Sequence, residues 1–261
     1  MVASAAMQSL REKKQRGERI TALTAYDYPT ARLLDECGVD VILVGDSLGM
    51  VVLGFEDTTQ VTLADMVHHT RAVARGVKRA LLIADLPIHT YETPDRALNT
   101  ARQLMSAGAQ AVKLEGGLSR VPQIEAIVDA GIPLMGHIGM LPQSVREEGG
   151  YKVKGRTPAE AESLLADGLA VEAAGAFAVV LEIVAAETAR NVTAGLQIPT
   201  IGIGSGDGCD GEILVTHDLI GLFPWFVPKF VKPEADVAGE MRRAFAAYIE
   251  RTTGSGVPRE V

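Results

Sequence analysis

Cysteine is scarce in this chain. Two cysteines, Cys37 and Cys209, occur among the 261 residues, far apart and without CxxC spacing or a neighbouring histidine. This pattern gives no sign of a disulfide framework or of a zinc site. We predict that both cysteines pack as small apolar side chains.

The sequence also lacks long apolar runs and an excess of basic residues. No apolar segment is long enough to cross a bilayer, and residues 1–19 lack the apolar core of a signal peptide. We therefore expect a cytoplasmic protein with no membrane partner. The formal net charge is −8, so no surplus of Lys and Arg is available for phosphate backbones, and we expect no nucleic-acid partner.

Short apolar runs alternate along the chain with stretches of helical period, which is typical of a parallel sheet wrapped by helices. The eight candidate strands lie near Ile20–Ala25, Val41–Val44, Leu81–Ala84, Ala111–Leu114, Leu134–Gly136, Ala178–Leu181, Thr200–Ile203 and Ile213–Val215. A length of 261 residues is close to the roughly 250 of one (β/α) barrel. We predict an α/β fold, a TIM-type (β/α)8 barrel with extra terminal helices, as a single domain over residues 1–261.

Local signals mark the ends of several helices. Thr93 precedes Pro94, a pairing typical of a helix start, and Thr157 to Glu160 fits a capping box. Gly108 and Gly175 are expected to end these two helices. A last helix is predicted at about Val237 to Arg251, followed by a frayed tail from Gly254 to Val261.

A doubly wound open sheet is the alternative fold, and its only support is the glycine-rich stretch from Gly206 to Gly211. This stretch comes late in the chain, and no strand ending in an acidic residue follows at the spacing of a dinucleotide site. We therefore interpret it as a glycine-rich loop after the seventh barrel strand.

Polar side chains gather directly after the apolar runs. They are Asp27, Asp46, Ser47, Asp85, Glu115, His137 and Glu182. In a parallel barrel these strand ends share one face, which is where barrel active sites are built. Asp27 by itself is better interpreted as the cap of the following helix.

Three of these carboxylates, Asp46, Asp85 and Glu115, are candidates for a metal site. If they converge within about 4 Å, each pair repels by about 4 kcal/mol at an effective dielectric near 20, and a bound cation would relieve this. Oxygen ligands without Cys or clustered His suit a hard divalent ion, and Mg²⁺ more than Ca²⁺.

Three further side chains are candidates for work on a substrate. Lys113 and Glu115 point to the same side of their strand, so Lys113 either holds an anionic substrate group or forms a structural ion pair. His137 is either a substrate contact or a structural donor. Glu182 follows an apolar run, and desolvation there would raise its pKa toward that of a general base; a solvated acid is the alternative.

At these residues the sequence resembles the ketopantoate hydroxymethyltransferase family, from about Ile20 to Lys232. Matching stretches surround the polar side chains and include Thr24–Tyr28, Val44–Met50, Ala84–Pro87, Val112–Gly117, Gly136–Gly139, Pro142–Ser144, Gly149–Val153, Ile201–Gly204 and Pro228–Lys232. The resemblance implies a barrel of the phosphoenolpyruvate-utilising superfamily that is a homo-oligomer, often a decamer.

The resemblance also implies a reaction and the residues that perform it. The reaction moves a hydroxymethyl group from methylenetetrahydrofolate to α-ketoisovalerate through a magnesium-stabilised enolate, giving ketopantoate in pantothenate biosynthesis. By position, Asp46, Asp85 and Glu115 match the magnesium site, with Glu115 acting through water. The keto-acid contacts match Asp46, Ser47, Asp85, Lys113 and His137, and the proton acceptor matches Glu182.

Two other functions remain open from the residues themselves. One is a magnesium-dependent carbon–carbon lyase or phosphonate mutase on the same barrel, although the chain has no Lys-Cys-Gly-His type of loop. The other is a barrel that binds a small anion without catalysis, which would have no use for a proton acceptor such as Glu182.

We further expect the apolar residues near Leu222, Phe223, Trp225 and Phe226 to lie in a subunit interface. A Trp225→Glu variant should then form a smaller assembly, because a buried unpaired carboxylate is costly at such an interface. Light scattering measures this directly, and an unchanged assembly would contradict the expectation.

Overall fold

The computed structural model describes residues 2–254, with the side chains of residues 2–4 left out. The chain divides into two compact units, one running through Ile213 and the other beginning at Leu214.

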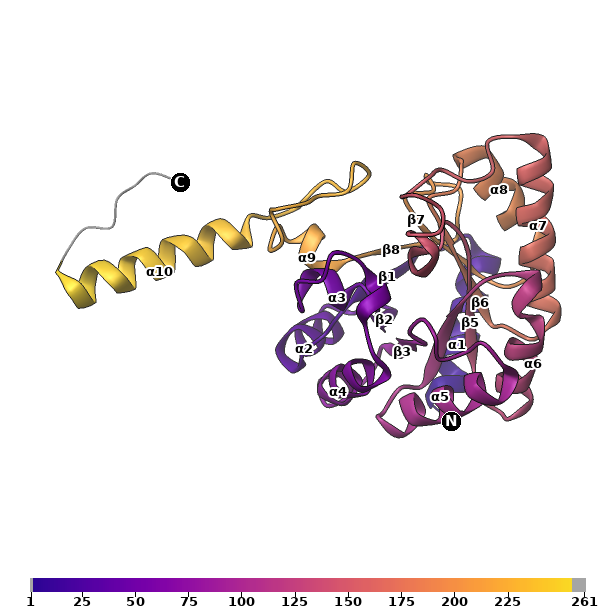
Figure 1. Cartoon of the computed structure of the whole chain (residues 1–261), viewed down its shortest axis with the longest axis horizontal. Coiled ribbons are helices and arrows are strands. Elements are labelled where there is room, and N and C mark those ends of the chain that lie inside the picture. Colours follow the sequence, from indigo (N-terminus) through magenta and orange to yellow (C-terminus); the bar gives the residue numbers. More distant parts are fainter. Residues whose placement is uncertain (1, 255–261) are drawn as a thin grey trace. The chain divides into compact units, whose positions relative to one another are not determined.

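The first unit is built on eight parallel strands that close into a barrel in sequence order (Figure 1). The strands are β1 (Ile20–Thr24), β2 (Val41–Val44), β3 (Leu81–Asp85), β4 (Ala111–Glu115), β5 (Leu134–Gly139), β6 (Ala178–Glu182), β7 (Thr200–Ile203) and β8 (Gly211–Leu214). The predicted (β/α)8 barrel is confirmed, and the open-sheet alternative is wrong.

Helices surround the strands of this barrel (Figure 1). The longer ones are α2 (Tyr28–Cys37), α4 (Leu63–Ala74), α5 (Pro94–Ser106), α6 (Val121–Asp129), α7 (Pro158–Ala173) and α8 (Ala186–Gly195). Short turns of helix lie in the loops: α3 (Leu48–Val51), η1 (Thr58–Gln60), η2 (Leu118–Arg120) and η3 (Pro142–Ser144).

The predicted helix ends are confirmed. The hydroxyl of Thr93 accepts from the Arg96 N–H at the start of α5, and Thr157 and Glu160 form both bonds of a capping box on α7. Gly108 and Gly175 follow these helices with φ of 111° and 93°, in the left-handed region that favours glycine. Asp27 is an exposed cap of α2, as interpreted from the sequence.

The sheet is buried on both faces. Side chains such as Leu43, Ile83 and Val180 fill the barrel, while the alternate residues Ile42, Leu82 and Val179 pack in the outer cluster. This alternation follows from the two-residue period of a strand. Polar side chains in line with the interior set therefore point into the barrel, where water is largely excluded.

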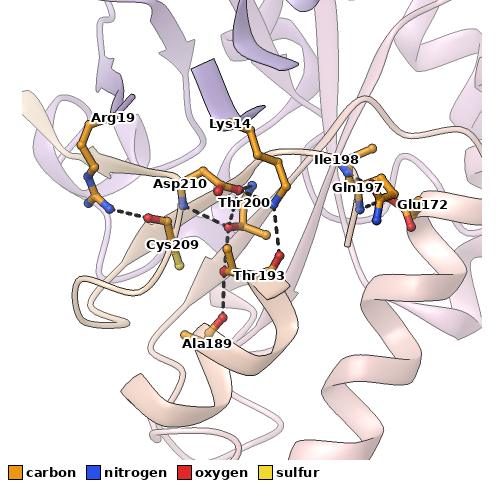
Figure 2. A network of polar contacts seen from close by, with 10 residues as sticks. All are labelled: Lys14, Arg19, Glu172, Ala189, Thr193, Gln197, Ile198, Thr200, Cys209 and Asp210. Carbon is orange, nitrogen blue, oxygen red and sulfur yellow. Dashed lines mark hydrogen bonds and ion pairs between the residues drawn. The ribbon is translucent and has the colours of Figure 1, made fainter. Parts of the chain in front are cut away.

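The amino-terminal end of the barrel is covered by α1 (Val2–Arg16), one of the extra terminal helices expected from the sequence. Leu10 of α1 is buried in the barrel's interior cluster. Lys14 pairs with Asp210 at 2.8 Å and donates to the Thr193 carbonyl at 3.1 Å (Figure 2). The same oxygen of Asp210 accepts from the backbone N–H of Thr200, so α1 is tied to the loop before β8 and to the start of β7.

The connection between β7 and β8, residues 204–210, is described throughout and contains no helix. The alternation of strands and helices is therefore broken here, and the predicted glycine-rich loop is confirmed. Glycine is required because the chain runs close to its neighbours: a Cβ on Gly211 would meet the Ile20 carbonyl, and one on Gly206 would meet Ala186.

The two cysteines differ in their surroundings. Cys209 is buried, as predicted, but Cys37 is exposed, so the prediction for Cys37 is wrong. Cys37 is the last residue of α2, where the side chain projects from the helix end and not toward the barrel. No helix among residues 2–254 is long and apolar enough to cross a membrane.

The second unit contains α9 (Thr216–Leu219) and α10 (Val237–Thr253). α10 is the predicted last helix and extends two residues beyond the expected end, Arg251. It ends at Gly254, whose φ of 65° stops the helix in a left-handed cap. The predicted tail lies outside the described residues from 255 onward.

We expect Lys14→Met to destabilise the fold. The side chains of Lys14 and Asp210 are only 16% and 14% exposed, so their pair lies between a surface pair and a buried one, and its loss should cost about 2 kcal/mol. For a chain of this size the melting temperature should fall by about 4–8 °C. The matched control is Arg16→Met on the same helix, whose pair with Glu18 is half exposed and should matter little. Equal melting temperatures for the two variants would contradict this role of Lys14.

Candidate active site

The polar side chains predicted from the sequence meet inside one end of the barrel. Asp85, Glu115 and Glu182 are the last residues of β3, β4 and β6, and His137 lies within β5. Strand pairing places Asp85 beside Lys113 and Glu115 beside His137. The sequence analysis expected these residues directly after the strands, but they lie inside them. Each strand extends one to three residues further than predicted.

Asp46 and Ser47 reach the same region from the turn after β2. Asp46 is buried, and its backbone N–H donates to Asp85 Oδ2 at 3.1 Å. Ser47 Oγ lies 2.8 Å from the hydroxyl of Tyr26. The structure thus gathers the seven residues matched to the family's site at the carboxyl ends of β2 to β6. They are Asp46, Ser47, Asp85, Lys113, Glu115, His137 and Glu182.

Lys113 is a buried cation at the centre of this group, with only 5% of its surface exposed. Its Nζ lies 3.0 Å from Asp85 Oδ1 and 3.1 Å from His137 Nδ1. Burial alone would lower the pKa of Lys113, but the carboxylates of Asp85 and Glu115 outweigh it and raise that pKa. The ammonium therefore stays charged and partly offsets the repulsion between the carboxylates.

The carboxylates nevertheless carry strong mutual repulsion. Burial and, to a smaller extent, the charge of Asp85 together raise the pKa of Asp46 to about 7. Burial and the charge of Asp46 also raise the pKa of Glu115 well above its usual range. These shifts indicate that one cation does not balance the buried negative charge.

His137 connects Lys113 to Glu182. Burial and the charge of Lys113 hold the pKa of His137 well below its usual range, so the ring is neutral. Because Nδ1 faces the Lys113 ammonium, we assign the ring proton to Nε2, which lies 3.1 Å from Glu182 Oε2. Burial raises the pKa of Glu182 to about 7, although Lys113 acts in the opposite direction.

The backbone around Glu182 is held in an unusual conformation. Ile183 has a φ of 48°, a left-handed value that costs a β-branched residue on the order of 1–2 kcal/mol. The turn is fixed by neighbours: the Glu182 carbonyl accepts from Met140 N at 2.8 Å, and Ser205 Oγ accepts from Val184 N at 3.0 Å. Such strain is common where a side chain must be aimed at a reacting group.

Gln143 is a site residue that the sequence analysis did not single out. It lies in η3, is 5% exposed, and donates to Asp46 Oδ2 at 2.7 Å and to Glu115 Oε2 at 3.2 Å. The only sequence signal was its place in the Pro142–Ser144 stretch of the family resemblance. A lone glutamine in a loop carries no chemical pattern of its own.

The donor set at this end of the barrel fits a hard divalent cation. Within residues 2–254, no three His, Cys, Asp or Glu side chains are already arranged around a single metal position. However, Glu115 Oε1 is buried without a hydrogen bond to described residues, Asp85 Oδ1 lies 3.0 Å from the Lys113 ammonium, and carboxylate oxygens suit Mg²⁺. Asp46, Asp85 and Glu115 are thus able to hold such an ion if small side-chain rotations bring their oxygens together.

Comparison with known proteins gives the family. Residues 4–260 match the family model for ketopantoate hydroxymethyltransferase. The chain belongs to the ketopantoate hydroxymethyltransferase family. It is 53% identical to the 3-methyl-2-oxobutanoate hydroxymethyltransferase of Dehalococcoides mccartyi (strain CBDB1), over 95% of this chain and 90% of that protein. It is 54% identical to the enzyme of the same name from Moorella thermoacetica, over 92% and 90% of the two chains.

The family prediction is therefore confirmed, and the family consists of transferases. Solved structures of lower identity share its fold. A putative phosphonomutase from Burkholderia cenocepacia has a TM-score of 0.67 at 16% identity, covering 96% of this chain and 99% of that one. A 2,3-dimethylmalate lyase of the PEP mutase/isocitrate lyase superfamily has a TM-score of 0.62 at 21% identity, covering 98% and 91%. These likenesses support the predicted barrel fold.

We expect Glu182→Gln to stabilise the ketopantoate hydroxymethyltransferase fold at high pH. The pKa of Glu182 is raised from 4.5 to about 7, so its contribution to stability is present below pH 4.5 and is lost as the pH rises through 7. Glutamine cannot ionise. In the presence of chelator at pH 8, the melting temperature of the Glu182→Gln variant should therefore exceed that of wild type by about 3–6 °C. The difference should shrink as the pH falls and vanish near pH 4, below the ordinary pKa of 4.5.

The control for this measurement is Glu125→Gln, on an exposed position of α6. It should change the melting temperature little at either pH. If Glu182→Gln also has no effect at pH 8, the carboxylate of Glu182 is not confined in a desolvated site.

Proposed function

We propose that this chain transfers a hydroxymethyl group from methylenetetrahydrofolate to α-ketoisovalerate, giving ketopantoate for pantothenate and coenzyme A biosynthesis. Relatives that cover more than nine tenths of the chain bear the name 3-methyl-2-oxobutanoate hydroxymethyltransferase. The observation that carries the proposal is the buried Glu182 carboxylate beside neutral His137, in a group that also holds a charged lysine and three further carboxylates.

The keto acid is an anion, and Lys113 is the cation available to bind it. Its ammonium already lies 3.0 Å from Asp85, so the substrate carboxylate would share this charge from the open side of the barrel. The backbone and side chain of Ser47 and the side chains of Asp46, Asp85 and His137 surround the same position. They would fix the orientation of the keto group relative to Glu182.

Asp46 and Asp85 would hold Mg²⁺ directly, and Glu115 through a water molecule. When bound, the ion supplies Lewis-acid chemistry by withdrawing electron density from the keto group of the substrate. It would also balance the negative charge that raises the pKa values of Asp46 and Glu115.

Glu182 is proposed as the base that removes the β-proton of the keto acid. A pKa near 7 leaves a large carboxylate fraction at neutral pH and still gives enough basicity to accept a proton. His137 Nε2 lies 3.1 Å from Glu182 Oε2, and this contact would hold that carboxylate while its other oxygen meets the substrate. The resulting carbon nucleophile would form a carbon–carbon bond to the one-carbon unit of the folate, while water supplies the oxygen of the new hydroxymethyl group. Both carbon–nitrogen bonds to that unit break, and tetrahydrofolate leaves with one proton from the water and one equivalent to the proton that Glu182 removed.

A lyase or phosphonomutase activity has less support. The solved structures with those names are only 16–21% identical to this chain, which is evidence for a shared fold alone. A barrel that only binds an anion would not require the strained turn at Ile183 that fixes Glu182.

We also propose a cytoplasmic homo-oligomer, a decamer by family resemblance. In the second unit, Trp225 and Phe226 are 77% and 55% exposed, and Phe245 and Tyr248 of α10 are also exposed. Large apolar side chains at this density are typical of a surface that another subunit covers.

The reaction is tested by following the β-hydrogen of α-ketoisovalerate by proton NMR in heavy water. Wild-type protein should exchange this hydrogen for deuterium when Mg²⁺ is present but not when a chelator removes the ion. It should form ketopantoate once methylenetetrahydrofolate is added. Glu182→Gln should exchange it about 10²–10⁴-fold more slowly, whereas Glu125→Gln should match wild type. If folded, magnesium-loaded wild-type protein gives no exchange and no product, the proposed function is refuted.

A further inference from the structure

Gln143 makes hydrogen bonds within the buried site through its backbone N–H and through both ends of its side-chain amide. Its backbone N–H donates to Glu115 Oε2, and its Nε2 donates to Asp46 Oδ2 at 2.7 Å and to the Leu86 carbonyl at 3.0 Å. Its Oε1 accepts from the hydroxyl of Tyr91. The residue therefore bridges two carboxylates, one from the turn after β2 and the other from the end of β4.

Two atoms that can only accept determine which way the Gln143 amide faces. The NH₂ end points at Asp46 Oδ2 and the Leu86 carbonyl, and the Tyr91 hydroxyl donates to the remaining Oε1. Tyr91 is itself 6% exposed, and the guanidinium of Arg120 lies 5.1 Å from the centre of its ring. A flipped amide would place Oε1 against Asp46 Oδ2, which is a repulsive contact between two acceptors.

The hydrogen bonds from Gln143 occupy one oxygen of each carboxylate. Asp46 Oδ2 and Glu115 Oε2 are taken, and Glu115 Oε1 is buried without a hydrogen bond to any described residue. A carboxylate fixed through one oxygen has a restricted rotation, so its other oxygen is presented in a defined direction. Without Gln143, each carboxylate would be free to turn toward Lys113.

We propose that Gln143, held by Tyr91, is a positioning residue that presents the free oxygens of Asp46 and Glu115 to a divalent cation. This inference rests on the magnesium site of the proposed function and adds the pair of residues that shape it. The amide acts through the carboxylates and does not itself touch the substrate.

Loss of an outer partner of a metal ligand commonly weakens metal affinity by about 10–100-fold. Gln143→Met keeps the length of the side chain and removes the amide that bonds Asp46, whereas the backbone N–H to Glu115 remains, so the affinity for Mn²⁺ should fall by at least about tenfold. Tyr91→Phe keeps Gln143 but removes the hydroxyl that donates to its Oε1, and the affinity should fall by a smaller factor, about threefold or more.

The experiment is a titration of chelator-stripped protein with Mn²⁺, read by electron paramagnetic resonance without substrate. Two matched controls separate positioning from folding. Gln123→Met removes another glutamine that is 5% exposed and donates to the Glu92 carbonyl, and Tyr28→Phe removes a hydroxyl bonded to Arg32 on α2. Both controls should bind Mn²⁺ like wild type even where they lower the melting temperature.

Each outcome decides the matter. The proposal is supported if wild-type protein binds Mn²⁺ and both Gln143→Met and Tyr91→Phe bind it more weakly. If wild type and both variants bind Mn²⁺ with equal affinity, the positioning role of Gln143 is refuted, whereas the metal site itself is not. Wild type that binds no Mn²⁺ overturns the magnesium site and this inference together. If Gln143→Met does not fold, the affinity of Tyr91→Phe relative to Tyr28→Phe decides.

Discussion

The ion pair between Lys113 and Asp85 is the interaction on which the site depends. A buried ammonium is tolerated only where carboxylates surround it, and buried carboxylates accumulate only where a cation offsets their charge. The 3.0 Å contact joins β3 and β4 at the point where Glu115, Asp46 and His137 also converge. Removing the lysine would leave several acids with no internal counter-charge, so the geometry of every other group follows from this pair.

The two ends of the barrel show how the same interaction is used differently. At the amino-terminal end, Lys14 is fully matched by Asp210 and by backbone groups, and the pair fixes the closing helix. At the carboxyl end the carboxylates outnumber the one lysine, and burial raises the pKa values of Asp46 and Glu182 to about 7, with a contribution from the charge of Asp85 at Asp46. The pair at the amino-terminal end therefore serves the fold, whereas the charged group at the carboxyl end leaves carboxylates able to take up protons near neutral pH.

The sequence was sufficient for the barrel and for the charged residues and the histidine that meet at its carboxyl end. The period of the apolar runs gave the eight strands, and parallel strands necessarily bring their carboxyl ends together, so Asp85, Glu115 and Glu182 could be placed on one face. Strand ends were placed too early because Asp85, Glu115 and His137 interrupt the apolar pattern although they remain in register. Polar residues inside a barrel look like loop residues to a rule based on hydrophobicity.

Other features depend on contacts that no local pattern encodes. Gln143 and Tyr91 are 52 positions apart, and their hydrogen bond exists only because the loops after β3 and β5 fold over the same cavity. The exposure of Cys37 depends on the direction of one helix end. The missing helix between β7 and β8 reflects how tightly Gly206 and Gly211 let the chain turn against α8 and β1.

The helix α1 is tied to the barrel by Lys14 and packs against its interior through Leu10, so it closes the amino-terminal end. A molecule bound near Lys113 would therefore have to enter and leave at the carboxyl end. If the barrel joins two substrates as proposed, a second reactant that stacks above the first would block the first until the second departs. The deeper substrate would then bind first, and the product derived from it would leave last.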